Sequence, residues 1–166
     1  MNAIMNWQAV YPEIVLLTMA CVITLVDLWA TDPRKHVIYG LTQATLAAVA
    51  LLHLAAFNVG ATDYAMQRMV VADPLGHLLG FFATLAVMIS LAYARPYVAQ
   101  RDMLKGEFFT LSMFSLLGIL VMLSANNFLV VYLGLELMSL SLYALTALRR
   151  DHAPATWRAN TPPRHS

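Results

Sequence analysis

The stretch Phe128–Leu148 (FLVVYLGLELMSLSLYALTAL) decides the fold class, because it is long and apolar enough to cross a bilayer yet carries one acid, Glu136. A hydrocarbon core requires about 20 residues of helix. A carboxylate near the middle of such a helix costs roughly 2.5–3.5 kcal/mol on insertion scales. A helix that served only as an anchor would carry leucine there, so Glu136 is the leading candidate for a functional residue.

The composition of the whole chain agrees with a membrane protein. Of its 166 residues, 60% are apolar and only 11% are charged, whereas soluble domains carry about 25% charged residues. The net charge of +1 argues against a nucleic-acid-binding surface. The single cysteine, Cys21, excludes an internal disulfide and a multi-cysteine metal site. Since it lies in an apolar run, we expect it to be a small buried side chain.

Five apolar segments predict transmembrane helices, at about residues 10–30, 37–59, 74–94, 107–125 and 128–148. In lipid the backbone has to satisfy its own hydrogen bonds, so we expect helices throughout and no strands. Residues 1–150 therefore form a five-helix transmembrane region. Residues 151–166 hold three prolines and no apolar run, which predicts a polar disordered tail.

Two prolines mark the ends of the third segment. Asp73 precedes Pro74, which is typical of a helix N-cap followed by proline at the first helical position. At the other end, Arg95 and Pro96 are expected to close the helix.

The positive charges predict the orientation of the five helices. If the N-terminus lies outside, nine of the ten basic residues fall on the cytoplasmic side, and only Arg68 remains outside. This is a strong positive-inside pattern, and it places the C-terminus in the cytoplasm. The nine basic residues are Arg34, Lys35, Arg95, Arg101, Lys105, Arg149, Arg150, Arg158 and Arg164.

Glu136 belongs to a polar stripe along its helix. Tyr132, Ser139 and Tyr143 lie at i−4, i+3 and i+7 from it, which places all four on one helical face. The functional interpretation is a proton-path carboxylate, helped by these three residues, that faces the bundle interior or a hydrated cavity. The alternative is a structural carboxylate that is hydrogen-bonded to a neighbouring helix.

Three further acids lie near the ends of predicted spans and have simple structural interpretations. Asp27 is close in sequence to Arg34 and Lys35, which favours an interfacial ion pair. Glu13 lies in the first turn of its helix, where the helix dipole favours a negative charge. Glu107 likewise lies at the end of its span.

Two histidines lie in or beside the second and third spans. His77 follows Asp73 by one helical turn, so a local hydrogen bond is expected between them. His53 stands alone in the second span and is expected to be a satisfied structural histidine. No group of residues has the spacing of a metal site. Gly76 and Gly80 form a GxxxG motif, which permits close helix packing.

Beyond these local patterns, the sequence from Lys105 to Asp151 resembles a known family, subunit N of the proton-pumping NADH:quinone oxidoreductase, which is bacterial respiratory complex I. The most specific part is Tyr132–Tyr143 (YLGLELMSLSLY). The first span, Pro12–Trp29, and the segment Val70–Phe82 are also similar to proteobacterial members. The resemblance covers about residues 1–152.

This resemblance implies a part of an antiporter-like subunit of the membrane arm, in the bacterial inner membrane. Such subunits contain two inverted five-helix repeats, the first beginning at the fourth span. In the family the glutamate that corresponds to Glu136 pairs with a lysine on a later helix, from which buried lysines continue the proton path. NADH, FMN, the iron–sulfur clusters and quinone are handled by other subunits. This chain is expected to hold no redox centre, no cofactor-binding residue and no metal ligand, and its partners are expected to be other membrane-arm subunits and lipid.

The sequence departs from the family pattern after about residue 152. The helices that would carry the buried lysines are missing, and the tail from about Ala153 does not resemble the family. We interpret the chain as a truncated or frameshifted product that is not competent alone. Two alternatives remain open: a subunit of a cation/proton antiporter assembly, and a non-functional membrane fragment.

Overall fold

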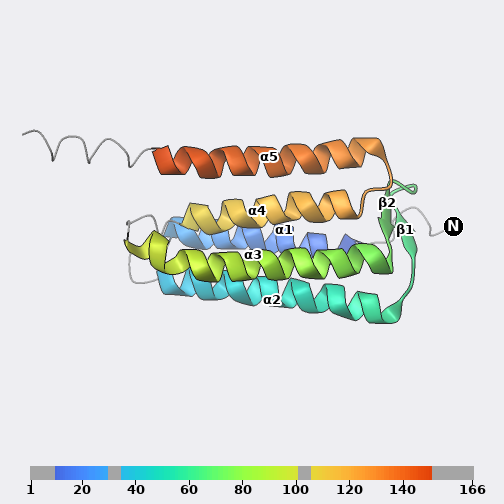
Figure 1. Cartoon of the computed structure of the whole chain (residues 1–166), viewed down its shortest axis with the longest axis horizontal. Coiled ribbons are helices and arrows are strands. Elements are labelled where there is room, and N and C mark those ends of the chain that lie inside the picture. Colours follow the sequence, from blue (N-terminus) through green and yellow to red (C-terminus); the bar gives the residue numbers. More distant parts are fainter. Residues whose placement is uncertain (1–9, 30–34, 101–105, 151–166) are drawn as a thin grey trace, which may run out of the picture.

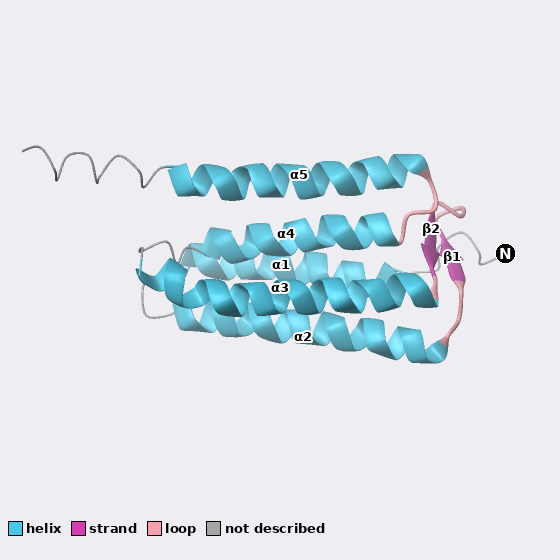
Figure 2. Cartoon of the chain, in the orientation of Figure 1, coloured by secondary structure: helices cyan, strands magenta, loops and turns pink. Residues whose placement is uncertain are grey.

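The structure is a computed structural model and describes residues 10–29, 35–100 and 106–150. The predicted tail, residues 151–166, lies outside the described residues. Five long helices lie side by side, and a short hairpin covers one end of the bundle (Figures 1 and 2). The elements are α1 Tyr11–Trp29, α2 Lys35–Val59, β1 Asp63–Ala65, β2 Val70–Ala72, α3 Pro74–Gln100, α4 Gly106–Leu123 and α5 Phe128–Arg150.

The five helices confirm the predicted fold class. Each is long and apolar enough to cross a membrane. The apolar runs form helices because a helix satisfies every backbone group within its own segment. Their surfaces remain apolar, as large hydrophobic side chains such as Leu28 and Phe128 are exposed. Cys21 also lies on this outer surface, so the expectation that it is buried was wrong.

Helix α4 is the centre of the bundle. It packs against α1, α3 and α5, and more weakly against α2 (Figure 1). Helix α5 has α4 as its main neighbour and is the least buried of the five. The core joins α1, α2, α3 and α4 and consists of Leu16, Ala20, Ile23, Ile38, Leu46, Val49, Leu91, Phe109, Met113, Leu116, Leu117 and Leu120.

Two glycines allow α4 and α5 to approach closely. A side chain at Gly118 would meet the backbone oxygen of Gly134 at 2.7 Å, and one at Gly134 would meet the backbone oxygen of Gly118 at 2.8 Å. In lipid, helix association depends on such close packing by small residues, because apolar side chains gain little by leaving lipid. The contact therefore fixes how α5 lies on α4.

The hairpin corrects the expectation that the chain has no strands. Strands β1 and β2 pair antiparallel, with Tyr64 opposite Val71. The hairpin is joined to the turn between α4 and α5: Val71 N donates to Ser124 O at 2.8 Å, and Asn126 N donates to Met69 O at 2.8 Å. The general argument for helices applies only within the hydrocarbon core, whereas this segment lies beyond the helix ends.

The ends of α3 are partly as predicted. Asp73 is the N-cap, since its Oδ1 accepts a hydrogen bond from Gly76 N at 2.9 Å, and α3 begins at Pro74. Its C-terminal end was predicted wrongly, because the helix continues through Pro96 to Gln100. A proline removes one backbone hydrogen bond without ending every helix that contains it. The guanidinium of Arg95 lies over the Tyr39 ring on α2, 4.5 Å from its centroid.

The Asp73 cap gives a first prediction. Replacing Asp73 with alanine removes the acceptor for Gly76 N and should destabilise the chain by about 1 kcal/mol. Thermal unfolding of the purified chain in detergent would show this as a lower Tm. Asp73→Asn keeps an acceptor oxygen and should stay closer to the parent chain. Equal Tm values for Asp73→Ala and the parent would refute the assigned role.

Candidate proton-path residues

Glu136 lies on the side of α5 that faces away from the bundle. Gly134 and Ser141 are buried against α4, and Glu136 is two residues from Gly134, which is roughly 200° around the helix. The carboxylate is nevertheless only partly exposed. The prediction that it faces the interior of the bundle therefore does not hold for these five helices.

The other members of the polar stripe share this outer face. Tyr132 is 56% exposed and Tyr143 is 70% exposed, whereas Ser139 is half-buried. The hydroxyl of Tyr132 interacts with the Glu136 carboxylate one turn along the helix. The stripe is thus an outward-facing polar row on an apolar helix.

No lysine lies in the two helices nearest to Glu136. The sequence contains two lysines, Lys35 and Lys105, and neither belongs to α4 or α5. A lysine partner for Glu136 therefore has to come from beyond these two helices.

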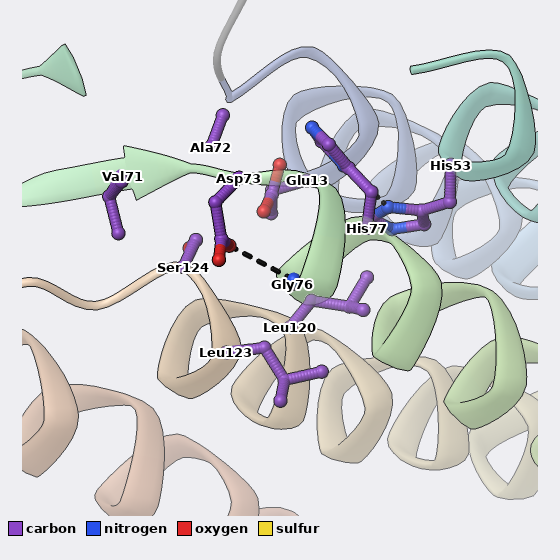
Figure 3. Close-up of a pocket in the computed structure, with 10 residues that line it drawn as sticks. All are labelled: Glu13, His53, Val71, Ala72, Asp73, Gly76, His77, Leu120, Leu123 and Ser124. Atoms are coloured by element: carbon purple, nitrogen blue, oxygen red, sulfur yellow. Dashed lines mark hydrogen bonds between the residues drawn. The ribbon is translucent and has the colours of Figure 1, made fainter. Parts of the chain in front are cut away.

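A second group of polar residues lies at the hairpin end of the bundle (Figure 3). Its members come from four segments that are distant in sequence: Glu13 on α1, His53 on α2, Asp73 and His77 at the start of α3, and Ser124 after α4. They line one small cavity of about 10 Å³, together with apolar residues of β2 and α4. We call these five residues the hairpin-end cluster.

The hairpin-end cluster changes the interpretation of both histidines. Nδ1 of His53 lies 3.2 Å from Nδ1 of His77, and the ring centroids are 5.4 Å apart. The expected link between His77 and Asp73 exists only through the backbone, His77 N donating to Asp73 O at 3.0 Å. His53 is buried but not fully satisfied, because its Nε2 has no hydrogen-bond partner among the residues that the structure describes.

Glu13 interacts with groups beyond the first turn of its own helix. It lies in the first turn of α1, as predicted, and its carboxylate interacts with its own backbone N–H and with Ser124. Glu13 is only 8% exposed, and within the described part of the chain its Oε2 has no hydrogen-bond partner. Sequence reasoning treated the members of the hairpin-end cluster singly, since no local spacing links four separate segments.

Gly80 explains how His53 fits against α3. A side chain at Gly80 would meet Cε1 of His53 at 2.8 Å, so the glycine makes room for the imidazole ring. The space beside Gly76, the other glycine of the motif, is filled by a different group, because a side chain at Gly76 would meet Oδ1 of Asp73 at 2.6 Å. The GxxxG motif therefore accommodates one ring and one helix cap.

Two further acids, Asp27 and Glu107, lie at the end of the bundle opposite to the hairpin. Asp27 packs against Gly106, at the N-terminus of α4, where the helix dipole favours an acid. The side chains of Arg34 and Lys35, its predicted ion-pair partners, lie outside the described residues. Glu107 is exposed in the first turn of α4. Among the described residues, no three or more His, Cys, Asp or Glu side chains are placed to hold a metal ion.

Comparison with known proteins identifies relatives of this chain, although no protein-family model matches it. It is 56% identical over 153 residues to NADH-quinone oxidoreductase subunit N of Polaromonas naphthalenivorans, and 50% identical over 155 residues to that of Herminiimonas arsenicoxydans. The subunit N of Methylovorus glucosotrophus is 44% identical over 157 residues. These alignments cover 91–94% of this chain but only 31–32% of each relative. Over about nine tenths of its length, this chain is therefore homologous to part of NADH-quinone oxidoreductase subunit N.

Proposed function

We propose that this chain forms part of the membrane arm of a proton-translocating NADH:quinone oxidoreductase in a bacterial inner membrane. The observation that carries the proposal is the 56% identity to a subunit N over 92% of the chain. Five helices that are able to cross a membrane agree with this location. Oxidation of NADH and reduction of quinone take place in other subunits of the enzyme, which hold FMN and the iron–sulfur clusters.

In this proposal the outer face of α5 is an interface with further helices of the membrane arm. The relatives are about three times as long as this chain, and α5 has only α4 as a main neighbour here. A charged side chain on a surface of membrane depth is expensive unless it meets a partner. We propose that Glu136 meets a lysine on a neighbouring helix and passes protons with it, helped by Tyr132, Ser139 and Tyr143.

The proposed orientation places the hairpin outside the cytoplasm. The hairpin contains Arg68, and Arg95 lies towards the opposite end, beyond the middle of α3. In the order of the five spans, the other nine basic residues of the sequence are expected on the side opposite to the hairpin, which the positive-inside pattern assigns to the cytoplasm.

Substitution of Glu136 tests the proposal. Glu136→Gln removes the proton-accepting oxygen and keeps the shape of the side chain. We expect NADH-driven proton translocation in membrane vesicles to slow by about a hundredfold, the low end of what a positioned proton-transfer group contributes. The vesicles would come from a strain whose enzyme contains this sequence.

Glu107→Gln is the matched control, because Glu107 is an exposed carboxylate in the first turn of α4. It should leave the rate within about twofold of the parent, since exposed single charges contribute little. A Glu136→Gln enzyme that pumps at the parental rate and proton-to-electron ratio would remove Glu136 from the proton path. A cation/proton antiporter would be favoured instead if the chain co-purified with other antiporter subunits and the preparation had no quinone reductase activity.

A further inference from the structure

We propose that the hairpin-end cluster is a proton-binding site, separate from Glu136, in which Glu13, His53 and His77 share one exchangeable proton through a water molecule. Three observations carry the proposal: the direct contact of the two imidazole rings, two buried polar atoms without partners among the described residues, and a cavity lined by Glu13, His53 and His77. Proton binding here does not depend on the proposed respiratory function.

The contact between the histidines limits how many protons they hold. Since Nδ1 faces Nδ1 at 3.2 Å, one nitrogen has to donate and the other has to accept. Two neutral rings satisfy this condition when one carries its proton on Nδ1 and the other on Nε2. One additional proton is also compatible, because an imidazolium still donates to a neutral ring. A second additional proton would place two N–H groups and two positive charges face to face. The histidine pair therefore binds one additional proton much more readily than two.

Glu13 supplies the negative charge that such a proton requires. Its side chain is 92% buried and that of His53 is 97% buried, as their exposed fractions are 8% and 3%. Each has one atom without a hydrogen-bond partner in residues 10–29, 35–100 and 106–150, namely Oε2 on Glu13 and Nε2 on His53. A buried polar atom without a hydrogen bond costs about 1–3 kcal/mol. In Figure 3 the His77 ring is drawn between the Glu13 carboxyl group and the His53 ring.

The cavity is suited to one water molecule. Its volume is about 10 Å³, which is close to the minimum that a water molecule occupies. A water there has acceptors and donors in the carboxyl group and the imidazole rings. The proton then moves between two states without a change in net charge: protonated Glu13 beside neutral histidines, or a Glu13 carboxylate beside a histidinium.

The other polar side chains at the cavity, those of Asp73 and Ser124, already take part in hydrogen bonds. Asp73, the N-cap of α3, accepts a hydrogen bond from Gly76 N. Ser124, which follows α4, interacts with Glu13 and donates to Val121 O at 3.4 Å. Among the described residues that line the cavity, the titratable side chains are Glu13 of α1, His53 of α2, His77 of α3 and Asp73, the N-cap of α3. The remaining lining residues are apolar or glycine apart from Ser124.

Nitrogen-15 NMR of the histidine-labelled chain in lipid nanodiscs tests the proposal. Titration of the parent chain should show His53 and His77 taking up one proton between them before a second enters at much lower pH. In Glu13→Gln, the affinity of the pair for its first proton should fall at least tenfold. Asp63→Asn is the control, since Asp63 is an exposed carboxylate on β1 at the same end of the molecule, and it should leave this affinity unchanged.

A readout on the parent chain alone covers the case in which Glu13→Gln does not fold. A scalar coupling between the two Nδ1 nuclei, transmitted through a shared hydrogen, is expected in the parent. Independent uptake of two protons, an affinity unaffected by Glu13→Gln, the absence of this coupling, or two rings that never titrate would each overturn the proposal.

Discussion

Replacing Gly134 with leucine is expected to separate α5 from α4. The new side chain would begin 2.8 Å from Gly118 O and 3.0 Å from Met122 N, and these backbone atoms are unable to rotate away as a side chain does. Overpacking of this kind costs about 1–3 kcal/mol and sometimes more. Losing the contact with α4 would remove most of the packing that holds α5 in place, because α4 is its main neighbour. Unfolding of the purified chain in detergent, followed by denaturant titration, should show a large decrease in the midpoint.

Gly40→Leu provides the comparison for this prediction. Gly40 lies on α2, and a side chain there would meet no atom within 4 Å. This variant should unfold near the parental midpoint. Gly118→Leu, the reciprocal change on α4, should behave like Gly134→Leu. Similar midpoints for Gly134→Leu and Gly40→Leu would show that the two helices do not depend on the glycine contact.

Replacing Phe109 with alanine is expected to destabilise the centre of the bundle by about 3–5 kcal/mol. Phe109 is 2% exposed and packs edge-on against Tyr39, with ring centroids 5.9 Å apart. In lipid, the free energy lost comes from van der Waals contacts with the residues around the new cavity. The same detergent unfolding experiment would measure the change in the free energy of unfolding.

Phe82→Ala is the matched control for this substitution. Phe82 is 56% exposed on α3, so its removal leaves no comparable cavity. We expect a change of less than about 1 kcal/mol, as is typical of surface positions. If both phenylalanine variants lost the same stability, the cluster around α4 would not be the core of the folded chain.

The five helices could be predicted because long apolar runs in a membrane permit few other structures. Glu136 could be found for the same reason, since an isolated acid is conspicuous in a segment of that length. Its outward direction could not be predicted, because the apolar and small residues of α5 do not reveal which side meets α4. The glycines that decide this, Gly118 and Gly134, are 16 residues apart in different helices.

The hairpin and the hairpin-end cluster could not be predicted for a different reason. Each strand has only three residues, which is too short for an alternating pattern to be recognised. Glu13, His53 and His77 each have an ordinary explanation in their own helix. Only the packing of α1 against α2 and of α2 against α3 brings them to one cavity.

The link between the hairpin and the α4–α5 turn has a consequence for biogenesis. During synthesis, the hairpin is complete at Ala72, but its partners Ser124, Ala125 and Asn126 follow about 50 residues later, after the chain has passed through α3 and returned through α4. At about 5–20 residues per second, this interval lasts roughly 3–11 s. During this interval, of the segments that pair with β2 in the structure only β1 has been synthesised. Correct insertion of α3 and α4 therefore brings the partners to the hairpin, and a chain that misses either crossing leaves the backbone groups of Met69 and Val71 without them.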